Sequence, residues 1–291
     1  MPEIVIETRP HDLGGGFEVG RVLPFRKHRS VGPFVFFDRM GPHELAAPIP
    51  PERDVRPHPH IGLSTVTYLF EGEMTHRDSL GYKQLIQPGE LNWMTAGSGI
   101  SHSERFDGMR PAGGRLDGIQ AWVALPEEFE EIKPSFVHYN EFELPVMTEE
   151  GIWARLIAGS AFGLESPVTV HSSLFYLHME VTAGKRVPLP QDYAERAVYI
   201  NSGKLQVKGQ TYVAGQMLVF AKDSLPVVQA LENASLMLLG GEPLGPRHIW
   251  WNFVSSRKER IEQAKEDWKA GKIPLPPDDH VEFIPLPETI A

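Results

Sequence analysis

The chain has 291 residues, of which 41 % are hydrophobic and 23 % charged, proportions of an ordinary globular protein that exclude disorder throughout. The formal net charge of −10 disfavours direct binding to nucleic acid, because neutralising phosphates requires a basic surface. The absence of cysteine excludes disulfides, thiolate nucleophiles and cysteine-based zinc sites.

Targeting and membrane signals are missing from the sequence. The opening residues lack a basic start followed by an apolar core, so they do not resemble a signal peptide. No run of about 18 apolar residues is present to span a bilayer. We therefore expect a cytoplasmic protein with no membrane contact.

Short apolar runs separated by glycine and proline turns follow one another along the first half. Residues 63–70 are rich in β-branched and aromatic side chains and end in a turn at Gly72. Residues 91–94 follow a Pro-Gly turn, and residues 119–125 form a further strand that stops at Pro126. This spacing predicts a many-stranded β domain.

The composition changes after Pro126. Residues 127–131 are an acidic run, and Pro134 and Pro145 interrupt the segment that follows. Such a run is typical of a solvated connecting segment. We therefore place a domain boundary near residue 140, which gives domains at residues 1–140 and 141–291.

The second half begins the strand pattern again. Residues 175–181 and 204–208 alternate between apolar and polar side chains, and residues 217–220 are apolar on both faces, as in a core strand. One long helix is predicted over residues 256–270. Ser256 and Glu259 have the spacing of a capping box, the apolar face comprises Ile261, Ala264 and Trp268, and Gly271 can end the helix.

The two halves repeat one pattern of strand, glycine turn, strand, turn and apolar strand. His58 lies fourteen residues before Gly72, and Pro188 lies fifteen residues before Gly203. A duplicated β-barrel explains the repeat better than one continuous sheet does. The sequence thus predicts an all-β protein of two fused barrels with a short C-terminal helix.

Two pairs of residues in the first half have the spacing of metal ligands. His58 and His60 are two apart, so on a strand both imidazoles project to one face and can reach one metal ion. His102 and Glu104 repeat the spacing with a histidine and a carboxylate. If the two strands pair or face each other, the four side chains form a site of three nitrogens and one oxygen.

This set of donors suits one mononuclear divalent transition metal. Fe(II) is the preferred choice, and Mn, Co, Ni, Cu or Zn also fit, because imidazole and carboxylate do not discriminate sharply among these ions. Four protein ligands on a six-coordinate metal leave about two positions for substrate or dioxygen, which favours catalysis over a closed structural site.

The second half provides an internal comparison. Aligning its turns on those of the first half puts Pro188 and Pro190 where His58 and His60 stand, and residues 227–228 near the counterpart of His102. None of these side chains can bind a metal. We expect the second barrel to be free of metal.

His76 and Asp78 are also two residues apart. They can form a pair that orients a metal ligand, or they can make structural hydrogen bonds. From the sequence we favour the structural role.

Several motifs resemble those of the pirin family, within the cupin superfamily: residues 58–62, 71–72, 76–81, 88–97, 99–104 and 247–268. The resemblance covers nearly the whole chain. It implies two cupin-type barrels with one iron in the N-terminal barrel, held by the same four residues that the spacing selects. Many single-domain cupins carry a ligand glutamate shortly after the histidine pair. Ser64 occupies that place here, so Glu104 has to supply the carboxylate.

The resemblance implies two classes of function. Some pirin-like proteins cleave flavonols such as quercetin, which implies a metal-dependent dioxygenase acting on a small aromatic substrate, with Glu104 as the base that accepts the flavonol hydroxyl proton. Others are implicated in transcriptional control, which implies a non-enzymatic metal- or redox-sensing regulator that acts through a protein partner. A different small-molecule substrate is a third reading. We favour the enzyme, and the sequence makes no prediction of oligomeric state.

Overall fold

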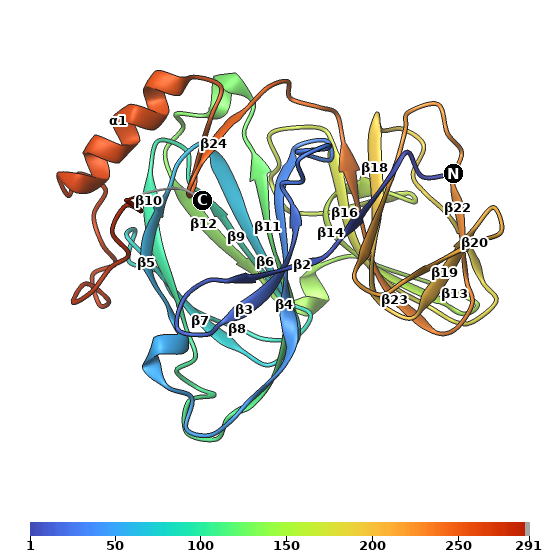
Figure 1. Cartoon of the computed structure of the whole chain (residues 1–291), viewed down its shortest axis with the longest axis horizontal. Coiled ribbons are helices and arrows are strands. Elements are labelled where there is room, and N and C mark those ends of the chain that lie inside the picture. The colour runs from blue at the N-terminus through green and yellow to red at the C-terminus, as the bar shows by residue number, and fades with distance from the viewer. Residues whose placement is uncertain (289–291) are drawn as a thin grey trace. The chain divides into compact units, whose positions relative to one another are not determined.

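The computed structural model describes residues 1–288 and is dominated by β-sheet, with one α-helix in that range (Figure 1). The strands divide into two compact units. The unit that contains His58, His60 and His102, here called the histidine unit, comprises residues 10–19, 37–141 and those from 244 onward. The other, here called the apolar unit, comprises residues 1–9, 20–36 and 142–243. This confirms the predicted all-β class.

The large sheet that includes most of the histidine unit's strands has the order β12-β9-β6-β11-β4-β3-β2. Its strands are β2 (Arg9–Asp12), β3 (Glu18–Leu23), β4 (Phe34–Leu45), β6 (Leu63–Glu71), β9 (Leu91–Thr95), β11 (Gly114–Ala124) and β12 (Ser135–Tyr139). A smaller sheet has the order β5-β10-β7-β8. Its strands are β5 (Val55–His60), β7 (Met74–Asp78), β8 (Lys83–Ile86) and β10 (Ile100–Arg105).

The apolar unit repeats this plan. Its large sheet has the order β1-β21-β18-β23-β16-β14-β13, with β15 paired to β14, and its small sheet has the order β17-β22-β19-β20. The large sheet comprises β1 (Ile4–Glu7), β13 (Val146–Glu149), β14 (Ile152–Ala161), β15 (Leu164–Glu165), β16 (Leu174–Val181), β18 (Glu195–Ser202), β21 (Gln216–Phe220) and β23 (Ala234–Gly241). The small sheet comprises β17 (Arg186–Pro188), β19 (Lys204–Val207), β20 (Gln210–Val213) and β22 (Val227–Ala230). The matching strand orders confirm the duplication.

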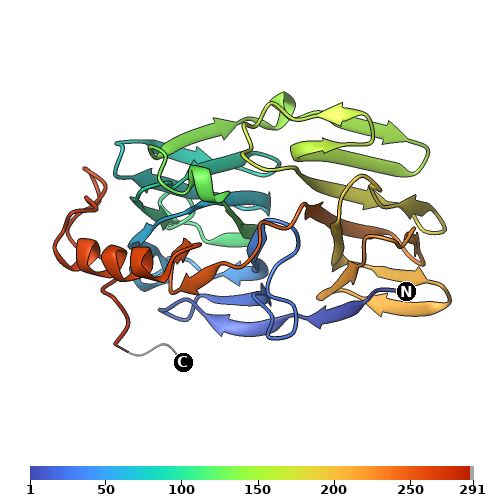
Figure 2. The same ribbon diagram turned by 90° about the horizontal axis from the view of Figure 1, so that it is seen from above.

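The two compact units differ at both ends of the chain from the predicted domains, residues 1–140 and 141–291. The strand β1 pairs antiparallel with β21 of the apolar unit, from Ile4 opposite Val219 to Glu7 opposite Gln216 (Figure 2). It takes the place beside β21 that β12 takes beside β9 in the histidine unit. The residues from 244 onward belong to the histidine unit. The division into domains at residues 1–140 and 141–291 stays a prediction.

The remaining elements are short. Three 3-10 helices lie at η1 (Pro51–Arg53), η2 (Glu127–Phe129) and η3 (Glu141–Glu143). A hairpin of β24 (His248–Trp250) and β25 (Phe253–Ser255) leads into the helix α1 (Lys258–Lys269) (Figure 1). Within residues 1–288 no helix is long and apolar enough to cross a membrane.

The helix forms nearly where the sequence predicts it, but its start is built differently. Its three buried side chains are the predicted ones, and they pack with Ile61, Phe253 and Ile273. The predicted capping box is wrong. The N-cap is Arg257, without a side-chain cap, because the N–H and hydroxyl of Ser256 both donate to Glu130, at 2.7 and 3.1 Å.

Glu130 is the exception in the acidic run predicted to be solvated, in which Glu127, Glu128 and Glu131 are exposed. Its side chain is 3 % exposed and forms an ion pair at 3.1 Å with Nε of Arg247, itself 7 % exposed. It also accepts a hydrogen bond of 2.8 Å from the hydroxyl of Ser255. A single carboxylate thus fastens the loop after β11 to the segment that precedes α1.

The interiors of the two units differ. In the apolar unit, Pro188 on β17 stands opposite Val227 on β22, and Val187 opposite Val228. Val187 and Val228 belong to a large apolar cluster with Leu189, Leu205 and Leu218. In the histidine unit the corresponding pair of strands, β5 and β10, carries histidines.

Candidate metal centre

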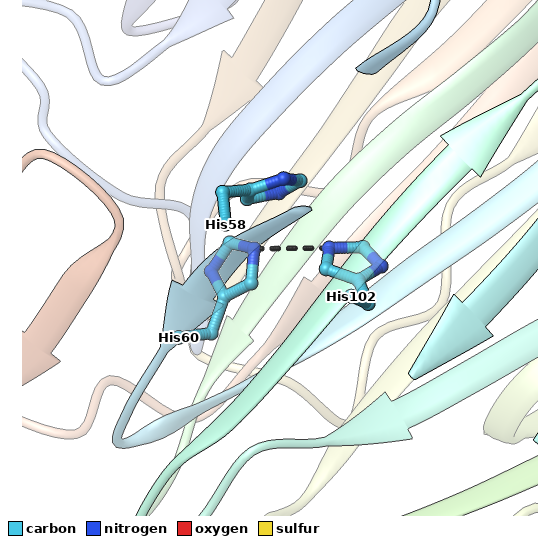
Figure 3. Close-up of side chains that lie close together, drawn as sticks. All are labelled: His58, His60 and His102. Carbon is cyan, nitrogen blue, oxygen red and sulfur yellow. Dashed lines mark hydrogen bonds between the residues drawn. The ribbon is translucent and has the colours of Figure 1, made fainter. Parts of the chain in front are cut away.

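The pairing of β5 with β10 brings three of the predicted ligands together. His58 and His102 are direct cross-strand partners, and His60 lies two residues from His58 on the same face. All three side chains are buried, and their rings lie close together (Figure 3). One ring nitrogen from each histidine lies within 4.8 Å of the corresponding nitrogens of the other two. The sequence prediction that these histidines converge is therefore correct.

The spacing of the nitrogens matches metal binding. Nε2 of His60 lies 3.1 Å from Nε2 of His102. Two imidazoles bound at right angles to one ion, with metal–nitrogen distances of about 2.1 Å, place their nitrogens about 3 Å apart. The ring centroid of His58 lies 4.4 Å from that of His102 and 4.9 Å from that of His60.

Hydrogen bonds behind the rings fix two of the tautomers. Nδ1 of His58 lies 2.8 Å from the carbonyl oxygen of Arg56, and Nδ1 of His60 lies 3.1 Å from that of Asn252. A carbonyl oxygen only accepts, so in both rings Nδ1 carries the hydrogen and Nε2 presents a lone pair. Asn252 sits in the turn between β24 and β25, far from the motif in sequence, and no sequence signal points to it.

Burial keeps the histidines neutral. It lowers the pKa of His58 to about 4, and the pKa of His60 and of His102 lies well below the usual value for the same reason, with the neighbouring histidines adding to the effect. Metal ligation requires neutral imidazole. The three rings are thus neutral at neutral pH, as metal binding requires.

Glu104, the fourth predicted ligand, is buried on β10 but lies outside the group of three converging nitrogens. It follows His102 by two residues, so it faces the same interior. Its Oε1 lies 3.2 Å from the hydroxyl of Thr67 and 3.5 Å from Nε2 of Gln120. Burial raises the pKa of Glu104 to about 7. Its role as a ligand stays a prediction.

Aromatic side chains enclose the histidines. The ring of Trp122 on β11 stands edge-on to His60 at a centroid distance of 5.2 Å. Phe136 on β12 stacks on His76 at 4.3 Å with an interplanar angle of 11°. Burial lowers the pKa of His76, against the opposing effect of its hydrogen bond to Asp78. Aromatic rings thus border His60 and His76, while Glu104 lies beside the polar side chains of Thr67 and Gln120.

The opposite face of β10 is covered by the C-terminal segment. The hydroxyl of Ser101 donates to the carbonyl of Pro274 at 2.6 Å, and that of Ser103 donates to Asp279 at 2.6 Å. Arg105 binds both carboxylate oxygens of Asp279, at 2.7 and 2.8 Å. The alternation of β10 therefore points the predicted ligands inward, while every second residue anchors the C-terminal segment.

Comparisons with known proteins agree with this geometry. A family model described as Pirin matches residues 16–123, and one described as Pirin C-terminal cupin domain matches residues 176–274. A pirin-like protein of Caulobacter vibrioides is 61 % identical over 289 residues, which cover 99 % of this chain and 100 % of that protein.

Solved structures show the same similarity. The crystal structure of a quercetin 2,3-dioxygenase from Acinetobacter baumannii matches with a TM-score of 0.89 and 33 % identity, covering 99 % of this chain and 97 % of the other. A second structure of that name and organism has a TM-score of 0.87 and 25 % identity, covering 94 % and 98 %. The prediction of two cupin-type domains is thereby confirmed.

Proposed function

The chain belongs to the pirin family, and from that premise we propose that it is a metal-dependent dioxygenase that cleaves a flavonol or a related small aromatic molecule. The observation that carries the proposal is the convergence of three neutral, buried histidine nitrogens within 4.8 Å. The structural relative named quercetin 2,3-dioxygenase supports the choice of substrate class.

The donor set fits a divalent transition metal, and we propose Fe(II). His58, His60 and His102 would hold it through Nε2, and Glu104 would complete the set from the next inward position on β10. When bound, the metal would supply Lewis-acid and redox chemistry toward the substrate and dioxygen.

Glu104 is also the residue we propose as general base. In the metal-free protein, burial raises the pKa of Glu104 to about 7, so its surroundings disfavour the carboxylate and favour the transfer of a proton to it. The proton it would accept is that of the flavonol hydroxyl. The hydroxyl of Thr67 and the amide of Gln120 hold the carboxyl group in place on the side of Oε1.

The proposal is tested by anaerobic reconstitution of the purified chain with Fe(II), followed by addition of quercetin and oxygen. We expect quercetin to disappear with consumption of oxygen, and the reaction to require the metal. Full metal occupancy without turnover of quercetin or other flavonols would contradict the proposal. A metal-sensing regulator acting through a protein partner would then be the better description.

Metal affinity is expected to depend on pH through Glu104. In the metal-free protein the raised pKa keeps this carboxyl protonated below about pH 7, so a metal that binds it has to displace the proton. Affinity should fall about tenfold for each pH unit below about 7 and level off above it. Titration of metal-free protein with Co(II) at several pH values measures this.

The matched variant for that titration is Glu104→Gln, which keeps the shape of the side chain and removes the titrating group. We expect weaker binding at pH 8 and a nearly flat profile between pH 6 and 8, since the pKa of His58 lies near 4. A variant whose profile keeps the wild-type slope would show that Glu104 does not bind the metal.

A further inference from the structure

His76 and Asp78 lie directly behind His102, on the neighbouring strand β7. Asp78 is the cross-strand partner of His102, and His76 is that of Glu104. His76 is 4 % exposed and Asp78 is fully buried. Nδ1 of His76 lies 3.4 Å from Nδ1 of His102, and Nε2 of His76 lies 3.0 Å from Oδ2 of Asp78. A chain of hydrogen bonds thus runs from Asp78 through His76 to a metal-binding ring.

Asp78 sets the direction of this chain. Its Oδ1 accepts hydrogen bonds from the backbone N–H groups of Leu80 and Tyr82, at 2.9 and 3.2 Å, and its Oδ2 faces Nε2 of His76. A carboxylate oxygen accepts, so Nε2 of His76 carries the hydrogen and Nδ1 of this neutral ring is left as an acceptor. His102 then has to donate from its own Nδ1, which leaves its Nε2 with a lone pair.

A second hydrogen bond competes for the same proton. Nε2 of His60 presents a lone pair and lies 3.1 Å from Nε2 of His102. If His102 carried its hydrogen on Nε2, it would donate to Nε2 of His60. This hydrogen bond would make both nitrogens unavailable to a metal. The tautomer of His102 therefore decides whether the site presents three lone pairs or is closed by an internal hydrogen bond.

The three rings differ in what holds them. His58 and His60 donate to backbone carbonyl oxygens, so the acceptor of each hydrogen bond is not part of a side chain. His102 depends on two side chains, His76 and Asp78. Substitution of either of these side chains can therefore change the tautomer of His102.

We propose that His76 and Asp78 are positioning residues, which hold His102 in its metal-binding tautomer and so keep the site open in the metal-free protein. This inference rests on the proposed metal site and adds to it the residues that prepare the site. Partners that orient a metal-binding histidine typically contribute about 10- to 100-fold in metal affinity.

The substitution Asp78→Asn tests the direction of the chain. The asparagine oxygen can still accept the N–H groups of Leu80 and Tyr82, while its amide nitrogen faces Nε2 of His76 as a donor. His76 then has to carry its hydrogen on Nδ1 and donate to His102, which moves the proton of His102 to Nε2. A nearly isosteric change thus reverses the hydrogen bonds without removing the loop contacts.

The tautomer is measured in the metal-free protein by ¹H–¹⁵N NMR of the histidine rings, with the His102 signals assigned by their loss in His102→Gln. We expect hydrogen on Nδ1 of His102 in the wild type and on Nε2 in Asp78→Asn. We also expect the Co(II) affinity of Asp78→Asn to fall about 10- to 100-fold. His76→Phe retains an aromatic ring beside Phe136, removes both hydrogen bonds and should shift the tautomer in the same way.

Asp107→Asn is the matched control, because Asp107 forms an ion pair with Arg77 of the same strand β7 and its side chain is 41 % exposed. It should leave the tautomer and the Co(II) affinity unchanged. Hydrogen on Nε2 of His102 in the wild type, or an unchanged tautomer in both Asp78→Asn and His76→Phe, would overturn the inference. The NMR measurement needs neither metal nor substrate, so a failure of the proposed dioxygenase activity would be seen separately.

Discussion

Replacing His60 by alanine is expected to abolish metal binding and, with it, any metal-dependent turnover. The substitution removes one of three converging nitrogens and leaves two, so the affinity should fall by more than about 100-fold, beyond the loss caused by removing an outer partner of a ligand. Metal content after reconstitution with Fe(II) and dialysis measures the binding, and oxygen consumption with quercetin measures the turnover.

The same substitution also removes a buried ring that contacts Trp122, so its effect on folding has to be separated from its effect on the metal. Thermal unfolding of the metal-free wild type and variant makes that separation. His43→Ala serves as the control, since His43 lies on β4 outside the converging group and bonds to the carbonyl of Glu18. Normal Fe(II) content in a folded His60→Ala protein would show that the three histidines are not the metal site.

The second large effect is expected for Glu130→Ala. The substitution leaves the guanidinium of Arg247 buried without its carboxylate and removes the acceptor for Ser255 and Ser256. Loss of one partner of a buried ion pair typically costs about 3–5 kcal/mol. We therefore expect a clear fall in the unfolding temperature of the metal-free protein, and faster proteolysis at Arg257 and Lys258 as the start of α1 loosens.

Glu131→Ala is the matched control for that experiment. Glu131 is the next residue in the same loop and pairs with Arg257 and Arg260, but its side chain is 45 % exposed. Exposed ion pairs contribute about 0–1 kcal/mol, so the control should unfold close to the wild-type temperature. Equal effects of the two substitutions would mean that burial of Glu130 does not matter to the fold.

Glu130→Ala should also weaken metal binding, although Glu130 touches none of the histidines. Ser255, which donates to Glu130, lies three residues after Asn252, whose carbonyl accepts a hydrogen bond from the ring of His60. A looser hairpin would let this carbonyl move away from Nδ1. Co(II) titration of the folded variant measures the effect, which should be smaller than that of His60→Ala.

Local features of the sequence are sufficient to predict the class of fold and most of the candidate site. Alternation along a strand depends only on local backbone geometry, so the spacing of His58 with His60 was enough to put both rings on one face. Other local patterns, of residue type, alternation and turn residues, predicted the strands β6, β9, β16, β19 and β21. The helical spacing of apolar residues predicted the buried face of α1. Repetition of the turn spacing in the two halves predicted the duplicated sheets.

Features that depend on contacts between residues distant in sequence are visible only in the folded structure. The register of β5 and β10 sets His102 opposite His58, and the carbonyl of Asn252 returns to the ring of His60. Residues 1–9 belong to the apolar unit and those from 244 onward to the histidine unit. Each of these features joins segments that no local sequence pattern relates. Ser256 shows the reason most directly. Its spacing with Glu259 satisfies a local capping rule, but the buried carboxylate of Glu130 offers its N–H and hydroxyl a better acceptor, because a buried charge has to be hydrogen-bonded.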